Sequence, residues 1–147
     1  MDNLEKTEIK VNLSSTFWDK APKARIYIND SCMFDDAVAA EQPIDLSVEL
    51  PEGKHKLIVE LYNKDKYQTV LQDDKIVKDQ LLNINSVSFD DIDIGYLSHK
   101  LSKYYPDQNY YSNSAPLLVN NCVNLGYNGR WELEFTTPIY IWLLENI

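Results

Sequence analysis

The chain has 147 residues, of which 44% are hydrophobic, and a formal net charge of -9. A chain of this length can bury roughly 70% of its unfolded surface, so we expect a single domain spanning residues 1–147. Its acidic surface has no basic cluster, so we expect neither nucleic acid nor a membrane as a partner, because phosphate binding needs clustered Lys and Arg.

The first ten residues, MDNLEKTEIK, are polar and acidic and have no apolar core of the kind a signal peptide needs. We therefore expect a protein that is not secreted by a signal peptide. Cys32 and Cys122 are far apart and form no CxxC pair. They are expected to be small, reduced core residues.

Strands are predicted wherever apolar and polar residues alternate. In the first half of the chain these are Ile9–Leu13, Ala24–Ile28 with Met33–Ala39 as a returning arm, and Ile44–Leu50. Pro51-Glu52-Gly53 is a turn sequence, because Pro fixes φ and Gly permits a positive φ. We expect this turn to join Ile44–Leu50 to the next strand as an antiparallel hairpin.

Two apolar strands are predicted in the middle of the chain, Leu57–Tyr62 and Leu81–Phe89. The second changes parity along its length, since Leu82 and Ile84 share one face whereas Val87 and Phe89 share the other. A β-bulge near Asn85–Ser86 would bring all four to the same side. Asp90–Asp91 is expected to form the turn that follows.

The last third has a different character. Residues 96–105 place Leu97 and Leu101 one helical turn apart, and Pro106 ends the pattern, so a short helix is predicted there. Asn128-Gly129 predicts a hairpin turn leading into the strand Trp131–Phe135. The apolar C-terminus is expected to cap the core through Ile141 and Leu143. The whole pattern predicts an all-β, antiparallel, jelly-roll-like β-sandwich with one short helical segment near 96–105.

One stretch carries a family resemblance. Gly53-x-His55-x-Leu57, Tyr62-Asn63-x-Asp65 and Asp79-x-Leu81 with Ile84, followed by an acidic turn and Ile-x-Ile-Gly, resemble calcium-dependent xylan-binding carbohydrate modules. The resemblance implies a jelly-roll β-sandwich and calcium-dependent sugar binding.

A second resemblance covers the C-terminal half. LLNINSVSFDDIDIG, SKYYPD and LGYNGRWELEF with PIYIWLLENI are similar to small proteins of tailed bacteriophages, especially marine ones. This resemblance implies a structural or decoration-type component of the virion, present in many copies and bound to other capsid or tail proteins. Such a protein would be found in the virion and, during assembly, in the host cytoplasm.

The residues themselves indicate no catalysis, because no nucleophile, phosphate-loop or metal-hydrolase motif is present. His55 shares the parity of Leu57 and is expected to be buried or at the rim. The acidic connection between the middle strands is the predicted calcium site, because calcium takes six to eight oxygen ligands. Its candidate ligands are Asp65, Asp73, Asp74 and Asp79. The alternative is a solvated, charged loop.

Aromatic residues mark the candidate binding surface, which comprises Trp18, Tyr104, Tyr105, Tyr110 and Tyr111. Trp18 is expected to pack against the rim of its own domain, and the alternative is an exposed binding aromatic. The tyrosines suit a protein interface, because Tyr supplies large contact area at low entropic cost. They also suit sugar stacking, or a loop that merely covers one end of the sandwich. We favour a non-catalytic virion protein that acts by protein–protein binding, with a glycan-binding module as the alternative.

Overall fold

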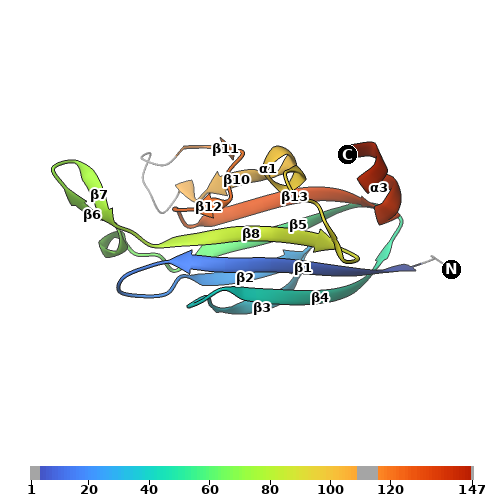
Figure 1. Cartoon of the computed structure of the whole chain (residues 1–147), viewed down its shortest axis with the longest axis horizontal. Coiled ribbons are helices and arrows are strands. Elements are labelled where there is room, and N and C mark those ends of the chain that lie inside the picture. The colour runs from blue at the N-terminus through green and yellow to red at the C-terminus, as the bar shows by residue number, and fades with distance from the viewer. Residues whose placement is uncertain (1–3, 109–115, 147) are drawn as a thin grey trace.

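The computed structural model describes residues 4–108 and 116–146, which form two antiparallel sheets packed face to face (Figure 1). The five-stranded sheet contains β12 (Asn124–Leu125), β8 (Leu81–Phe89), β1 (Leu4–Thr16) and β4 (Gln42–Pro51), with β9 (Ile92–Asp93) beside β8. The six-stranded sheet has the order β11 (Val119–Asn120), β10 (Lys103–Pro106), β13 (Gly129–Thr137), β5 (Gly53–Tyr62), β2 (Lys23–Ile28) and β3 (Ser31–Ala37). The prediction of an all-β sandwich is confirmed.

In the described part of the chain, four smaller features accompany the sandwich: a hairpin, two helices and a 3-10 turn. The hairpin of β6 (Val70–Gln72) and β7 (Lys75–Lys78) projects from one end, and the helix α3 (Ile139–Asn146) lies at the other (Figure 1). The short helix α1 (Leu97–Leu101) precedes β10, and a 3-10 turn, η1 (Lys66–Gln68), precedes β6. No helix among the described residues is long and apolar enough to cross a membrane.

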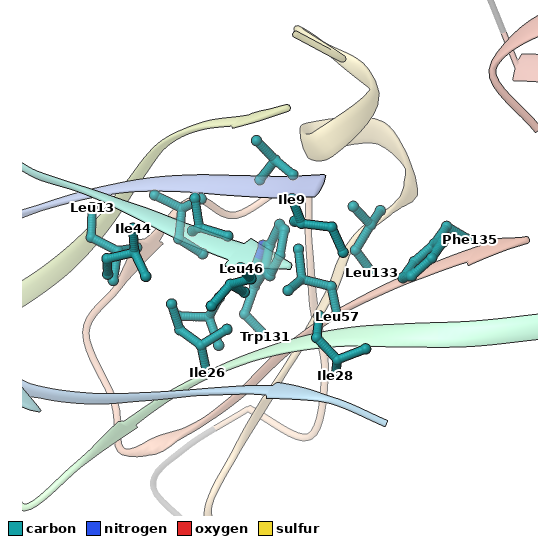
Figure 2. Close-up of a cluster of buried hydrophobic side chains, with 14 of the residues drawn as sticks. Ile9, Leu13, Ile26, Ile28, Ile44, Leu46, Leu57, Trp131, Leu133 and Phe135 are labelled. Atoms are coloured by element: carbon teal, nitrogen blue, oxygen red, sulfur yellow. The ribbon is translucent and has the colours of Figure 1, made fainter. Parts of the chain in front are cut away.

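The core fills the space between the two sheets, because each strand turns every second side chain inward. Figure 2 shows side chains from both layers meeting there, including Ile9 of β1, Leu57 of β5 and Trp131 of β13. Each such side chain contributes about 1.5–3 kcal/mol by leaving water. The predicted strands were expected to bury the apolar residues of one face, and all but one of these residues are buried. Val48 is half-buried, whereas the buried ones are Leu46, Leu57, Val59, Leu61, Ile84, Val87, Leu133 and Phe135. His55 is buried as well.

The β-bulge in β8 lies where the change of parity predicts it. Asn12 of β1 pairs with Ser86 and Leu13 pairs with Ile84, so Asn85 is the extra residue of the bulge. Side chains on both sides of the bulge, Ile84 and Val87 among them, are therefore buried. A continuous register would have turned half of this strand's apolar side chains toward solvent.

The two predicted hairpins at Pro51–Gly53 and Asn128–Gly129 are wrong. The chain does turn at both places, but each turn carries it from one sheet to the other. β4 pairs with β1 rather than with β5, and β12 and β13 lie in different sheets. The strands on either side of each turn bury one apolar face. Two partners in a hairpin and two strands that face each other across the core both show this alternation, so the sequence pattern does not distinguish them.

The predicted helix over 96–105 is correct only in its first part. α1 ends at Leu101, and Lys103–Pro106 is a strand whose residues alternate between exposed and buried. Near the C-terminus, Trp142 and Leu143 of α3 are buried against the core, as expected for Leu143, whereas Ile141 is exposed. The thiols of Cys32 and Cys122 are free. Cys32 is exposed and is not a core residue, whereas Cys122 is half-buried and packs against the core.

Candidate functional site

A hollow lies on the outer face of the six-stranded sheet, where β5 ends and β13 begins. It has a volume of about 480 Å³, and we call it the cleft. Its lining residues are Arg25, Glu60, Leu61, Tyr62, Asn63, Lys64, Asp65, Tyr105, Asp107, Asn128, Gly129 and Arg130. Four strands that are distant in sequence, β2, β5, β10 and β13, contribute to it.

The strand register places five polar side chains in one row across this face. Asp35 pairs with Arg25, Arg25 with Glu60, Glu60 with Arg130, and Arg130 with Tyr105. Neighbours in such a row on one face of an antiparallel sheet are close enough to interact directly. The row therefore runs from the β3 edge of the sheet to β10, across the cleft.

Glu60 lies at the centre of the row and binds the two arginines of the chain. Its carboxylate is 3.1 Å from Arg130 Nε and 3.5 Å from Arg25 Nη1, and its side chain is only 17% exposed. Arg25 Nε also lies 3.3 Å from Asp35 Oδ2. Charge-assisted bonds of this kind hold the guanidinium groups in fixed orientations. Part of their donor capacity is thereby directed to Glu60 and Asp35, and both arginines line the cleft.

Tyr62 forms one side of the cleft and is itself held on both sides. The Arg25 guanidinium lies 3.8 Å from the centre of its ring, and its hydroxyl donates a short hydrogen bond to Asp35. This hydrogen bond, with a further contribution from Arg25, lowers the pKa of Asp35 from its ordinary value. It also raises the pKa of the Tyr62 hydroxyl. Asp35 is therefore ionised and Tyr62 neutral at neutral pH.

Tyr104 and Tyr105 have opposite roles, because they are neighbours on a strand. Tyr105 is 40% exposed and lines the cleft, and its role as a binding aromatic stays a prediction. Tyr104 is 1% exposed and packs in the core, where its hydroxyl bonds the backbone of Tyr127. The prediction of Tyr104 as a surface binding residue is therefore wrong.

A buried polar cluster supports the end of the cleft. The Asn128 side chain accepts a hydrogen bond from the Lys64 backbone nitrogen at 2.9 Å and donates one to the Lys64 carbonyl at 2.8 Å. The Lys64 ammonium group reaches the other way, to Asp79 Oδ1 at 2.8 Å and the Gly126 carbonyl at 2.6 Å. These bonds tie the segment after β5 to the turn before β13.

The predicted calcium ligands are not brought together. Asp79 accepts hydrogen bonds from Lys64, Thr69 and its neighbour Gln80. Burial tends to raise the pKa of Asp79, but the bonds from Lys64 and Thr69 outweigh that effect and hold it below 3.8. Asp65 accepts from Tyr67 N at the start of η1.

The remaining two predicted ligands, Asp73 and Asp74, form the β6–β7 turn with positive φ angles of 54° and 64°. Among residues 4–108 and 116–146, no three His, Cys, Asp or Glu side chains converge as a metal site would require. The carboxylates in the acidic connection thus do not fit calcium, and Asp79 in particular is already neutralised by an ammonium group.

Trp18 lies at the base of the β6–β7 hairpin and is not among the residues that line the cleft. Its indole nitrogen donates to the Gln68 carbonyl at 2.9 Å, and Lys78 Nζ lies 4.6 Å from its ring centre. Although 45% of the residue is exposed, it packs against its own domain, as expected. Tyr110 and Tyr111 lie outside the described residues.

Reasoning from the sequence missed Arg25, Glu60, Tyr62 and Arg130. A usable signal was present, since Arg25 and Arg130 are the two arginines of a Lys-rich chain. Arg25 occupies an outward position of a predicted strand, and Arg130 directly precedes another predicted strand. Arg is preferred to Lys where a fixed, planar donor is needed. What the sequence could not supply was the strand order that brings both arginines to Glu60.

Comparison with known proteins supports the fold. No protein-family model and no curated protein sequence matches the chain significantly. Two solved structures of the carbohydrate-binding module vCBM60 are similar to it. One is the selenomethionine form of vCBM60, from work on a circular permutation that links two families of calcium-dependent carbohydrate-binding modules. Its TM-score to this chain is 0.58 at 11% sequence identity, and the match covers 86% of this chain and 89% of that one. The other is a complex with galactobiose (TM-score 0.56, 9% identity, 86% and 96% covered). The chain therefore has the β-sandwich fold of these modules.

Proposed function

We propose that the protein is a non-catalytic glycan-binding domain that holds sugar in the cleft between Tyr62 and Tyr105. The observation that carries the proposal is the convergence of the exposed Tyr105 ring with the fixed side chains of Arg25, Glu60 and Arg130 in one hollow. The similarity of the fold to modules that bind carbohydrate supports it.

The chemistry of the cleft suits a sugar. An aromatic face carries partial negative charge and attracts the slightly positive C–H groups on the flat side of a pyranose. Sugar hydroxyls both donate and accept hydrogen bonds, so they need donors and acceptors side by side. Arginine nitrogens supply only donors and the Glu60 carboxylate only acceptors. Because Glu60 fixes both arginines, little side-chain entropy is lost when a ligand binds.

The cleft is also close to electrically neutral. Its lining contains three cationic side chains (Arg25, Lys64, Arg130) and three acidic ones (Glu60, Asp65, Asp107), and the Lys64 ammonium group is paired with Asp79 outside the lining. On a chain with a net charge of -9, this balance favours an uncharged ligand over an anionic one.

A role in a phage particle remains a prediction. The resemblance that suggested it concerns the C-terminal half of the chain, and the same cleft would give a virion adhesion to glycans. A glycan-binding domain and a virion component are therefore compatible.

The proposal is tested with a glycan array, followed by titration calorimetry with galactobiose and xylobiose in buffer containing EDTA. Binding of at least one neutral glycan that is lost in Tyr105→Ala would support it. The matched control is Tyr140→Ala, because Tyr140 is an exposed tyrosine on α3. Absence of binding to every glycan, or equal loss in both variants, would contradict it.

A further inference from the structure

The cleft continues into two smaller hollows on the same face of the six-stranded sheet. Tyr105 lines the cleft and also the second hollow, of about 80 Å³. Leu101, Lys103 and Glu134 line the second hollow and also the third, of about 280 Å³. Shared lining residues mean that adjacent hollows adjoin, so the three form one series.

This series follows the strands rather than crossing them. Its floor on β13 begins at Gly129 in the cleft and reaches Thr136 in the third hollow, and on β5 it runs from Tyr62 back to Lys54. The seven steps from residue 129 to 136 correspond to about 24 Å at ~3.4 Å per residue. A disaccharide would occupy only part of this length.

One side of the series is raised above the sheet. Leu101, the last residue of α1, lines the second and third hollows together with outward side chains of β5 and β13. α1 therefore stands on the outer face of the sheet, beside the series. At the far end, Trp142 and Asn146 of α3 close the third hollow. The hollows thus have a floor, one wall and one closed end.

The floor carries charges of both signs. In the second hollow, Lys56 Nζ lies 3.1 Å from Glu132 Oε1. Counting the three linings together gives six cationic side chains and five acidic ones. The cationic side chains are Arg25, Lys54, Lys56, Lys64, Lys103 and Arg130, and the acidic ones are Glu60, Asp65, Asp107, Glu132 and Glu134. A nearly neutral floor rich in donors and acceptors suits an uncharged, hydroxyl-rich chain rather than a polyanion.

We infer that the three hollows form one groove that holds a stretch of a linear, neutral polysaccharide, with Tyr105 as the stacking platform near its middle. The inference rests on the proposed function and adds to it the class of ligand, an extended chain rather than a terminal mono- or disaccharide. In this arrangement the arginine end and the lysine end contact different sugar residues of the same chain.

The test is the dependence of affinity on chain length. Galacto-oligosaccharides and xylo-oligosaccharides of two to six residues are titrated into the wild-type protein by calorimetry. For at least one series we expect Kd to fall with each added residue, with the hexasaccharide binding about tenfold or more tightly than the disaccharide. Equal Kd values for disaccharide and hexasaccharide would overturn the groove but leave the glycan-binding proposal intact. No binding at any length would overturn both.

Two variants test whether the second and third hollows cause the dependence of Kd on chain length. Lys103→Ala, in the second and third hollows, is expected to reduce the ratio of disaccharide Kd to hexasaccharide Kd at least threefold. Lys10→Ala, on the five-stranded sheet, is the matched control and is expected to keep the wild-type ratio. A ratio unchanged in Lys103→Ala, or tighter binding of polygalacturonate than of the neutral hexasaccharides, would contradict the inference.

Discussion

The Lys64 ammonium group lies 2.8 Å from the carboxylate of Asp79, and the two side chains are only 6% and 19% exposed. The same ammonium group donates to the carbonyl of Gly126, just before the turn into β13. One buried ion pair therefore connects the segment that follows β5, the start of β8 and the end of the cleft. Its removal would leave a charge in a poorly solvated place.

We predict that Asp79→Ala lowers the free energy of unfolding by about 3 kcal/mol, because Lys64 would remain buried without its partner. Asp45→Ala is the control, since Asp45 forms an exposed ion pair with Lys10 and should cost less than about 1 kcal/mol. Urea denaturation with and without EDTA measures both effects. A wild-type protein stabilised by calcium, with no such response in Asp79→Ala, would restore the predicted calcium site.

The same pair predicts how stability depends on pH. The pKa of Asp79 is below its ordinary value of 3.8 in the folded protein, so its contribution is complete above that value and is lost as the pH falls through the folded pKa. The difference in unfolding free energy between the wild type and Asp79→Asn should therefore be constant from pH 7 to pH 5. It should shrink below about pH 3.8. A difference that persists unchanged to pH 2 would show that the ion pair contributes nothing.

Alanine substitution of the two neighbouring tyrosines of β10, Tyr104 and Tyr105, should have different effects on stability and on glycan binding. Tyr104→Ala is expected to cost about 4 kcal/mol, because a large core side chain and its hydrogen bonds are lost. Tyr105→Ala should cost less than about 1 kcal/mol and abolish glycan binding. Thermal denaturation and calorimetry distinguish the two. Equal destabilisation by both substitutions would argue against the alternation of β10.

Much of the sandwich can be predicted from local patterns, because burial of one strand face leaves a period of two in the sequence. That period located the bulge in β8, where Asn85 is the extra residue. It could not show that β4 and β5 belong to different sheets, since both bury one face in either case. For the site, the grouping of aromatic residues pointed to Tyr105. No local pattern pointed to Arg25 and Arg130, which meet only through the order of the strands.

Gly129 provides a test of the cleft wall. A Cβ atom at this position would lie 2.4 Å from the carbonyl oxygen of Tyr105 and 2.7 Å from Pro106 Cα. Because backbone atoms cannot yield as a side chain does, Gly129→Ala should push β10 away from β13. We expect a loss of about 2 kcal/mol in stability and weaker glycan binding. Gly126→Ala is the control, because its Cβ would meet only the Leu81 side chain, at 3.2 Å. It should reduce both the stability and the glycan affinity less than Gly129→Ala does.

The most direct test of glycan binding in the cleft is an NMR titration of the 15N-labelled protein with galacto- and xylo-hexasaccharides. The account predicts that at least one of them shifts the backbone amide signals of Glu60, Tyr105 and Arg130, while those of β4 stay unchanged. Shifts confined to the five-stranded sheet, or no shifts with either hexasaccharide, would contradict it.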